Sequence, residues 1–216
     1  MSINLPGPDA RTVVLGSTGS GKTQFSVWLL STRDFHRRAW FILDFKGDEL
    51  LDSIGAKLIS IREFPKEPGL YIIRPLPGED YLVSQFFYKC WVNENVGVFI
   101  DEGGMVPKMD KWFRACLTQG RSKHVEMIIC SQRPVWLDKY VFTEAWFYAV
   151  FNINFVDDNK AMRAYLGGIT PKRLTKYHSL WYDVSQHKSA ILGPVPNTEK
   201  LIEIFNAKLD TKPMKI

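Results

Sequence analysis

Gly16-Ser17-Thr18-Gly19-Ser20-Gly21-Lys22-Thr23 is the most informative segment of this chain. It contains every fixed position of the pattern G-x-x-x-x-G-K-[ST], which describes a phosphate-binding loop. The β-branched, mostly apolar residues 11–15 before it predict a buried strand, and the apolar residues within 25–30 after it predict a helix. A strand, a glycine-rich loop and a helix present backbone N–H groups to an anion at the helix N-terminus. These flanking elements favour a nucleotide-binding site over an ordinary glycine-rich turn.

Each residue type of this loop has a predicted role. The glycines let the backbone turn and approach phosphate groups closely. Lys22 can reach the β- and γ-phosphates of a nucleoside triphosphate, and the Thr23 hydroxyl can coordinate Mg²⁺. The predicted ligands are therefore ATP and Mg²⁺. The predicted nucleotide-binding set is Gly16, Ser17, Thr18, Gly19, Ser20, Gly21, Lys22, Thr23 and Gln24.

The composition is that of a globular chain. Of the 216 residues, 45% are apolar and 24% are charged, which is atypical of a disordered sequence. We expect one domain over residues 1–216, with a core at about 11–166 and a C-terminal β-hairpin and helix at about 167–216. The apolar runs are too short to cross a bilayer, so no transmembrane segment is predicted.

The net charge and the cysteine content say less about function than the phosphate loop does. The formal net charge of +5 mildly favours an anionic partner. The three cysteines show no metal-ligand spacing and predict buried thiols in a reducing compartment. The N-terminal residues lack the basic and apolar order of a signal peptide, so the expected location is inside a cell.

A second strong signal is Val96-Gly97-Val98-Phe99-Ile100-Asp101-Glu102, an apolar run that ends in two acids. Parallel α/β sheets bind ligands at the carboxyl ends of their strands, where Asp101 would contribute to the Mg²⁺ site. Glu102 could act as the general base toward an attacking water. Two acids often do no more than end a strand, but the phosphate loop upstream favours the functional interpretation.

The remaining segments predict further strands and helices. Residues 126–132 are a strand candidate with Gln132 at its carboxyl end, where that side chain could sense the γ-phosphate or position water; a polar strand cap is the alternative. The other predicted elements are strands at 39–44, 58–61, 70–73 and 145–153, helices at 81–92, 110–117 and 157–166, a hairpin of 179–185 with 188–195, and a terminal helix at 199–209.

Several segments together resemble the FtsK/HerA superfamily of translocating ATPases. Residues 118–134 are similar to the Gly-Arg turn of that superfamily and its fourth strand, which ends in Gln-Arg-Pro. Residues 42–50 resemble the Asp-Pro-Lys stretch of FtsK motors, although Phe45 replaces the proline. The resemblance covers most of residues 11–166. It implies a RecA-like α/β fold with a mostly parallel sheet of strand order 5-1-4-3-2, and a ring, expected to be a hexamer, that threads double-stranded DNA and binds ATP between subunits.

Within this superfamily, a compact chain is similar to the genome-packaging ATPases of tailless viruses with an internal membrane. This resemblance implies a motor that moves a double-stranded viral genome into a preformed capsid. It also implies action in the host cytoplasm during assembly, or on the virion at a capsid vertex, with vertex or viral membrane proteins as candidate partners.

The resemblance also implies an arginine finger supplied by the neighbouring subunit. Arg121 is the first candidate because it matches the Gly-Arg turn, and Arg133 and Arg114 follow; for each, a solvated surface arginine is the alternative. DNA should be gripped through its phosphates, because a motor must move over any sequence. The candidate contacts are Lys108, Lys111, Lys123, His124, Lys172, Arg173 and Lys176.

Three other functions remain open on the sequence. A related motor could export single-stranded DNA or filamentous virions. A scaffold could bind the nucleotide without hydrolysing it, although Glu102 argues against this because a binding module needs no base. A small-molecule kinase would leave the Gly-Arg turn and Gln132-Arg133-Pro134 unexplained.

Overall fold

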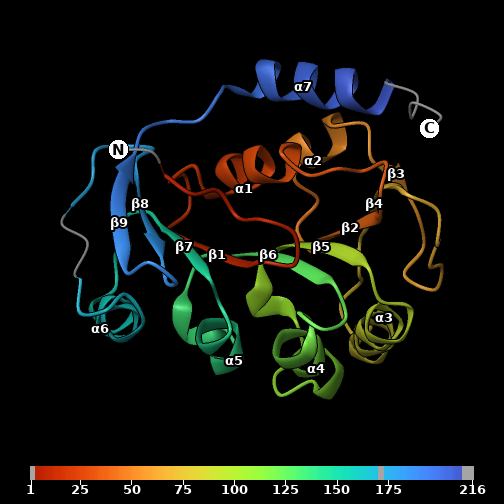
Figure 1. Ribbon diagram of the computed structural model, residues 1–216, viewed down its shortest axis with the longest axis horizontal. Helices are drawn as coiled ribbons and strands as arrows, with labels where there is room; N and C mark the ends of the chain where they lie inside the picture. The colour runs from red at the N-terminus through yellow and green to blue at the C-terminus, as the bar shows by residue number, and fades with distance from the viewer. Residues whose placement is uncertain (1–2, 170–172, 211–216) are drawn as a thin grey trace.

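The apolar runs of the chain form one twisted sheet in the computed structural model, which describes residues 3–169 and 173–210 (Figure 1). Within these residues the sheet has nine strands in the order β3-β4-β2-β5-β6-β1-β7-β8-β9. The strands are β1 (Arg11–Leu15), β2 (Ala39–Asp44), β3 (Lys57–Leu58), β4 (Gly69–Ile73), β5 (Val96–Asp101), β6 (Val125–Ser131), β7 (Phe147–Val150), β8 (Ser179–Asp183) and β9 (Lys188–Leu192).

The five central strands confirm the expected RecA-like order. Counted along the chain as β1, β2, β5, β6 and β7, they lie as 5-1-4-3-2 and pair in parallel. Two further parallel strands, β4 and β3, extend the sheet beyond β2. The predicted C-terminal hairpin is present, and it continues the sheet because β8 pairs antiparallel with β7 and β9 with β8. The single-domain organisation of residues 1–216 stays a prediction.

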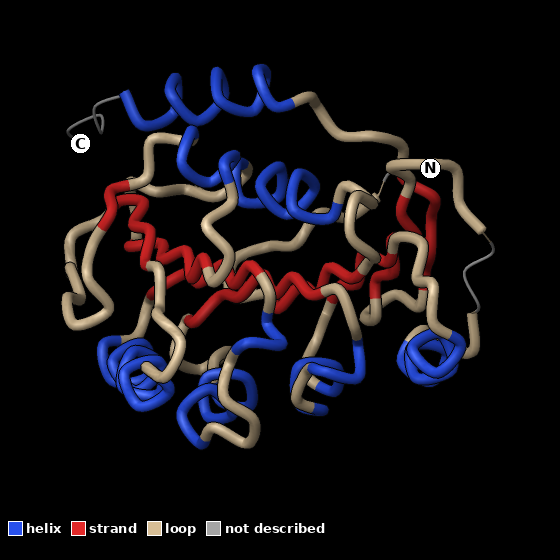
Figure 2. Tube along the Cα trace, turned by 180° about the vertical axis from the view of Figure 1, so that it is seen from behind, coloured by secondary structure: helices blue, strands red, loops and turns tan. Residues whose placement is uncertain are grey.

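Helices cover both faces of the sheet, as Figures 1 and 2 show. On one face lie α1, α2 and α7, and on the other α3, α4, α5 and α6. The helices are α1 (Lys22–Ser31), α2 (Glu49–Ser53), α3 (Asp80–Asn93), α4 (Lys111–Gln119), α5 (Lys139–Thr143), α6 (Val156–Tyr165) and α7 (Thr198–Asp210), with single 3₁₀ turns η1 (Gly103–Met105) and η2 (Pro134–Trp136).

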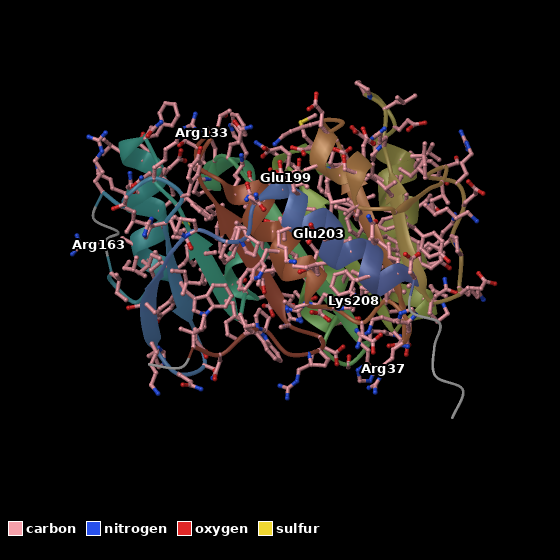
Figure 3. All side chains as sticks on the ribbon, turned by 90° about the horizontal axis from the view of Figure 1, so that it is seen from above. Arg37, Arg133, Arg163, Glu199, Glu203 and Lys208 are labelled. Atoms are coloured by element: carbon pink, nitrogen blue, oxygen red, sulfur yellow. The ribbon has the colours of Figure 1, made fainter. Side chains whose placement is uncertain are left out.

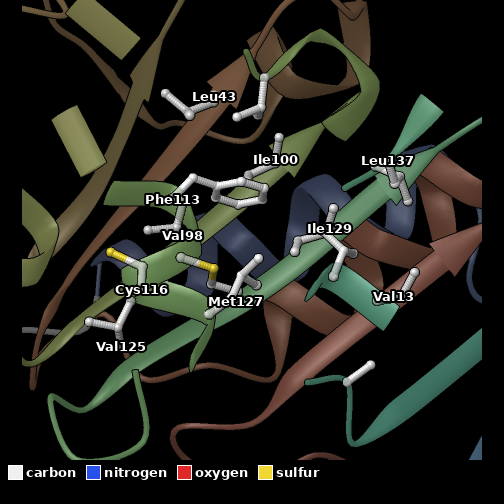
Figure 4. Close-up of a cluster of buried hydrophobic side chains, with 14 of the residues drawn as sticks. Val13, Leu43, Val98, Ile100, Phe113, Cys116, Val125, Met127, Ile129 and Leu137 are labelled. Carbon is white, nitrogen blue, oxygen red and sulfur yellow. The ribbon is translucent and has the colours of Figure 1, made fainter. Parts of the chain in front are cut away.

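The core consists of two apolar clusters, one on each face of the sheet. Side chains alternate between faces along a strand, so Val13 and Leu15 of β1 join one cluster and Val14 joins the other. Figure 4 shows the first cluster, in which Phe113 and Cys116 of α4 pack against strand residues such as Met127. Because both faces are covered, the central strands are buried along their whole length and are mainly apolar, as expected for a parallel sheet.

Several predicted strands are longer than those of the structure; the hairpin strands expected at 179–185 and 188–195 end at Asp183 and Leu192. The strand expected at 58–61 is reduced to β3, and Ile59 and Ile61 instead reach the core from the loop that follows. The strand expected at 145–153 is β7, which is shorter at both ends. Asn152 lies beyond the end of β7, where its side chain accepts a hydrogen bond from Leu174 N–H and donates one to the Leu174 carbonyl, both at 2.8 Å.

Helix lengths and hydropathies also bear on the membrane prediction. In residues 3–169 and 173–210, each helix is too short or too polar to cross a bilayer.

Candidate nucleotide site

The glycine loop lies at the carboxyl edge of the sheet, where β1 ends. Gly16 N donates a hydrogen bond to the Ser131 carbonyl at 3.3 Å, and Ser17 N donates to the Asn152 carbonyl at 3.1 Å. These bonds tie the loop to the chain just after β7 and to the end of β6. A Cβ atom on Gly16 would lie 2.6 Å from Ser20 Oγ and 2.7 Å from Phe151 Cβ, so only glycine fits at this position.

The second half of the loop turns into helix α1 through left-handed backbone. Gly19 has φ 73° and Gly21 has φ 95°, values that favour glycine, and α1 begins at the next residue, Lys22. No side chain of the described residues caps this helix end. The free N–H groups of its first turn and the positive end of the helix dipole therefore remain available to an anion.

Asp101 ends β5 directly beside the start of α1. The Thr23 hydroxyl donates a hydrogen bond to Asp101 Oδ1 at 3.3 Å. The other carboxylate oxygen, Oδ2, is buried and accepts no hydrogen bond from the described residues. Burial raises the pKa of Asp101, and the positive charge of Lys46 opposes that shift. A hydroxyl oxygen and a carboxylate oxygen with free coordinating capacity are hard donors, so these two residues fit Mg²⁺.

Glu102 follows Asp101 in a left-handed conformation, with φ 80°. Its Oε1 accepts hydrogen bonds from Ser131 Oγ at 2.7 Å and from Gln132 N–H at 3.2 Å. Its Oε2 forms an ion pair with Lys46 Nζ at 2.7 Å. Burial favours a raised pKa, but the hydrogen bonds from Lys46 and Ser131 outweigh it and hold the pKa of Glu102 below its ordinary value. The side chain is therefore an ionised carboxylate at neutral pH.

Gln132 completes the predicted set at this edge. It lies immediately after β6, and its Oε1 accepts a hydrogen bond from the Thr18 hydroxyl at 3.1 Å. The structure therefore brings together the loop, Lys22, Thr23, the two acids and Gln132, although they come from three separate segments of the chain.

Lys46 is a site residue that the sequence analysis did not assign. It follows β2, which lies beside β5, and so its ammonium group reaches both acids. The sequence feature that could have indicated a role for Lys46 is its position two residues after Asp44, the polar end of a buried strand. The resemblance of residues 42–50 to FtsK motors does not by itself predict an ion pair between Lys46 and Glu102.

Two predicted residues lie elsewhere or face away. Gln24 Nε2 donates a hydrogen bond to the Pro196 carbonyl at 2.6 Å, so its side chain is held by the C-terminal segment rather than by the loop. Arg121 precedes β6 at the opposite, amino edge of the sheet, where its guanidinium lies 5.4 Å from the centre of the Trp146 ring. Because β6 has seven residues, about 20 Å of strand at 3.3 Å per residue separates Arg121 from the loop of its own chain.

The other two arginine candidates are paired within the chain. Arg133 lies at the carboxyl edge, where Figure 3 shows it at the opposite end of the strands from Arg37. Its Nε donates a hydrogen bond to Asp158 Oδ2 at 2.9 Å. Arg114 of α4 pairs with Asp138 at 2.7 Å. Neither ion pair tests the arginine-finger prediction.

A cavity of about 780 Å³ lies beside the loop and is large enough for a nucleotide. Its walls include loop residues 17–20 and the segment with Arg173, Lys176 and Tyr177. A second cavity, of about 350 Å³, lies beyond Tyr177 and is bordered by Gly21 and Gln24. Tyr177, which is 46% exposed, borders both cavities.

A glycine loop at the carboxyl edge of a RecA-like sheet, with an acid pair two strands away, defines the class of P-loop NTPases. Within that class, the chain belongs to the family of viral DNA packaging ATPases. It is 41% identical over 220 residues to the DNA packaging ATPase P9 of Enterobacteria phage PRD1, and the match covers 95% of this chain and 96% of that protein. No model of a known protein family matches the chain.

Solved structures share the fold at low sequence identity. The genome packaging NTPase B204 of Sulfolobus turreted icosahedral virus 2, in complex with AMP, is 19% identical with a TM-score of 0.68, covering 88% of this chain and all of that one. The cytoplasmic domain of the type VII secretion ATPase EccC of Thermomonospora curvata is 14% identical with a TM-score of 0.62, covering 86% of this chain and 24% of that one. Both likenesses support the RecA-like fold.

Proposed function

We propose that this ATPase is a motor that uses ATP hydrolysis to move a double-stranded viral genome into a preformed capsid. The observation that carries the proposal is the convergence of Lys22, Thr23, Asp101 and Glu102 at one edge of the sheet, in a chain related along nearly its full length to a DNA packaging ATPase. The site provides for hydrolysis and the relationship indicates the cargo.

Each side chain has a distinct role in the proposed hydrolysis. The loop N–H groups and Lys22 hold the phosphates, and Thr23 and Asp101 would hold Mg²⁺. Bound there, Mg²⁺ would neutralise negative charge on the β- and γ-phosphates. Glu102 accepts the proton of the attacking water, because its carboxylate is ionised at neutral pH. Gln132 orients that water or senses the γ-phosphate beside Thr18.

The proposed assembly is a ring, expected to be a hexamer, with ATP between subunits. Arg121 lies at the amino edge of the sheet, too far from its own loop to act on the nucleotide that it holds. As an arginine finger it can therefore serve only the site of a neighbouring subunit, where it would stabilise charge on the transferred phosphoryl group. This geometry supports Arg121 over Arg133, which belongs to the edge that binds the nucleotide.

The basic residues that are candidates for DNA contact differ in their exposure and in whether they form ion pairs within the chain. Lys108 and Lys111 are exposed and follow β5, so they suit contact with phosphates passing this edge. Lys123 is paired with Glu94 at 2.5 Å, which makes it a weaker candidate. Arg173 and Lys176 border the cavity beside the loop and are better placed for the nucleotide, whereas Lys172 lies outside the described residues.

The proposed place of action is the host cytoplasm during virion assembly, with docking at a capsid vertex through vertex or viral membrane proteins. The relationship to a DNA packaging ATPase supports this placement.

The proposal is tested by steady-state ATP hydrolysis with and without long double-stranded DNA, at two salt concentrations. We expect duplex DNA to stimulate turnover, and the stimulation to fade as salt rises, because phosphate binding releases counterions. The Lys22→Ala variant is the control, since it should show no turnover with or without DNA. Turnover that is indifferent to DNA and salt would contradict the proposed cargo.

Repeating the hydrolysis assay with single-stranded DNA distinguishes a packaging motor from an export or transfer motor. Stronger stimulation by single-stranded than by duplex DNA would favour the related export or transfer motor over the packaging motor. Tight ATP binding without any turnover would instead favour the non-hydrolysing scaffold.

A further inference from the structure

One aromatic and two basic side chains cluster where three neighbouring strands begin. The strands β6, β1 and β7 lie side by side, and Arg121 precedes β6, Arg11 begins β1 and Trp146 precedes β7. The guanidinium carbons of Arg11 and Arg121 each lie 5.4 Å from the centre of the Trp146 ring. Both distances are within the range of a cation–π contact. Trp146 thus contacts the arginine that the proposed function takes as the finger.

The Trp146 ring is itself held in place. Its backbone N–H donates a hydrogen bond to the Arg11 carbonyl at 2.9 Å, and its carbonyl accepts one from Val184 N–H at 3.0 Å. The side chain is half-buried and packs against the apolar cluster on the α1 face of the sheet. Arg11 is buried, and its Nε donates a hydrogen bond to the Glu144 carbonyl at 2.8 Å. The ring therefore gives Arg121 a support that two strands hold.

The turn that carries Arg121 is fixed as well. The Gly120 carbonyl accepts a hydrogen bond from Val125 N–H at 2.8 Å, and the Lys123 carbonyl accepts one from Asn95 N–H at 2.9 Å. A Cβ atom on Gly120 would overlap a backbone carbonyl oxygen of α4, so only glycine fits directly before Arg121. The direction of the guanidinium is then decided by the Arg121 side chain and by what that side chain contacts.

The ring contact leaves the charge of Arg121 unneutralised. Arg121 is exposed and forms no ion pair with a carboxylate of the described residues, whereas Arg114 pairs with Asp138 and Arg133 pairs with Asp158. An aromatic ring contacts the flat face of a guanidinium and leaves the N–H groups in its plane free to donate. A carboxylate would occupy those N–H groups. The aromatic support therefore orients Arg121 and keeps its donors available for a phosphate.

Arg11 adds a reason for Arg121 to meet an anion. Burial lowers the pKa of Arg11, the charge of Glu144 opposes that shift, and the charge of Arg121 adds to it. The two guanidinium groups are thus close enough to repel each other. Arg11 Nη1 is also buried without a hydrogen-bond partner among the described residues. A phosphate beside Arg121 would relieve this repulsion.

We propose that Trp146 is a positioning residue for the arginine finger: its ring holds the face of the Arg121 guanidinium so that the N–H groups meet the γ-phosphate bound by the neighbouring subunit. This inference rests on the proposed function, because it takes Arg121 as the finger of a ring assembly. It adds the residue that orients the finger within its own subunit. A finger stabilises charge on the transferred phosphoryl group, so loss of the ring should lower kcat and leave KM for ATP unchanged.

The first test compares variants of Trp146 with and without a ring. In Trp146→Leu we expect kcat to fall about fivefold, the factor that an exposed cation–π contact supplies, while KM stays native. Trp146→Tyr keeps a ring and should hold kcat within about twofold of the native value. Trp112→Leu is the matched control, because Trp112 is also half-buried and lies 5.2 Å from a lysine ammonium, yet it does not contact Arg121. Equal losses of kcat in Trp146→Leu and Trp146→Tyr would overturn the proposal.

Mixed rings test whether Trp146 acts through the finger. A Lys22→Ala subunit cannot hydrolyse ATP but keeps its finger, and an Arg121→Ala subunit keeps its loop but lacks the finger. Mixed with long duplex DNA present, the two should restore turnover, because one supplies the finger to the other. Adding Trp146→Leu to the Lys22→Ala subunit should lower the restored turnover about fivefold, and adding it to the Arg121→Ala subunit should change nothing. Equal losses in both mixtures would mean that Trp146 only supports the fold, which contradicts the inference.

The parent mixture separates this inference from the proposed function. If Lys22→Ala and Arg121→Ala restore no turnover together, Arg121 is not a finger and both proposals fail. If they restore it and Trp146→Leu has no effect in the subunit that supplies the finger, only the positioning role fails. Trp146→Met replaces Trp146→Leu if that variant does not fold by circular dichroism. A variant that folds but no longer assembles in sedimentation would make Trp146 an interface residue and would also refute the positioning role.

Discussion

Charged residues cluster at both ends of the central strands, but the buried carboxylates of the two clusters differ in how completely they are paired. At the amino edge, Glu126 of β6 forms an ion pair with Arg33 at 2.8 Å, with side chains 5% and 7% exposed, and Arg38 bridges toward Asp9 at 3.1 Å. At the carboxyl edge, Asp101 is as deeply buried, yet its Oδ2 accepts no hydrogen bond from the described residues. At the amino edge both oxygens of the buried carboxylate face arginines, Arg33 at 2.8 Å and Arg38 at 3.9 Å. At the carboxyl edge one oxygen of the buried carboxylate accepts no hydrogen bond from the described residues.

This difference indicates what each edge is for. Anions paired with cations of the same chain, as at the amino edge, contribute to folding or its specificity and need no ligand. A buried carboxylate oxygen without a hydrogen bond, next to the free N–H groups of a helix start, is costly unless a ligand completes it. Substitutions at the carboxyl edge should therefore change catalysis, and those in the ion-pair cluster of the amino edge should change stability.

The largest expected effect is that of Lys22→Ala at the carboxyl edge. Loss of the ammonium group that meets the phosphates should lower ATP turnover by at least about 1,000-fold. The melting temperature should change little, and Lys200→Ala on the exposed face of α7 is the control of equal charge. Retained turnover in a folded Lys22→Ala chain would contradict the assignment of the whole site.

Glu102→Gln should be nearly as severe but different in kind. The amide cannot accept a proton, so turnover should fall by about 100-fold or more while ATP stays bound. Filter binding or fluorescence of a labelled ATP would detect the trapped nucleotide. Loss of ATP binding together with turnover would mean that Glu102 positions the nucleotide rather than the water.

At the amino edge, Arg33→Met should unfold the chain more easily and leave its chemistry intact. Removing one partner of a buried pair leaves Glu126 uncompensated, at a cost of about 3 kcal/mol in the free energy of unfolding. Urea denaturation measures this loss. The double variant Arg33→Met/Glu126→Leu should be more stable than Arg33→Met alone, and ATP turnover per folded molecule should stay native in both.

The same cluster predicts a pH dependence. Burial raises the pKa of Glu126 from 4.5 to about 7, against the charges of Arg33 and Arg38. Between these values the folded chain keeps a proton that the unfolded chain has lost, so the stability contribution of Glu126 falls as pH rises from about 4.5 to about 7. The expected loss is about 3 kcal/mol. A pH series of urea denaturation curves should show this slope in the native chain and a flatter one in Glu126→Gln.

The smallest effect concerns the rim of the nucleotide site. Tyr177 borders both cavities next to the loop, so a bound base on either side meets its ring. Tyr177→Ala should raise KM for ATP by about tenfold with little change in kcat, because stacking on an aromatic ring is lost. Tyr177→Phe keeps the ring and should behave as native, and Tyr81→Ala, at a more exposed position on α3, is the surface control. Unchanged KM would place the base elsewhere.

Much of this protein was predictable from contiguous sequence. The phosphate loop needs eight successive residues, and β5 with its terminal acids needs seven, so each motif is contained in one short segment. The alternation of apolar runs with helix-spaced segments also predicts an α/β sheet, because strand and helix periods differ. The order of the five central strands came from the resemblance to FtsK/HerA motors.

The tertiary structure decided which distant segments meet. The contact of Lys46 with Glu102 exists because β2 lies beside β5, and that of Thr18 with Gln132 because β1 lies beside β6. The position of Arg121 at the far edge follows from the direction of β6. The chemistry of the phosphate loop and of the acid pair depends on residues that are neighbours in the sequence. The contacts between distant segments depend instead on strand order and direction, which short-range sequence patterns do not encode.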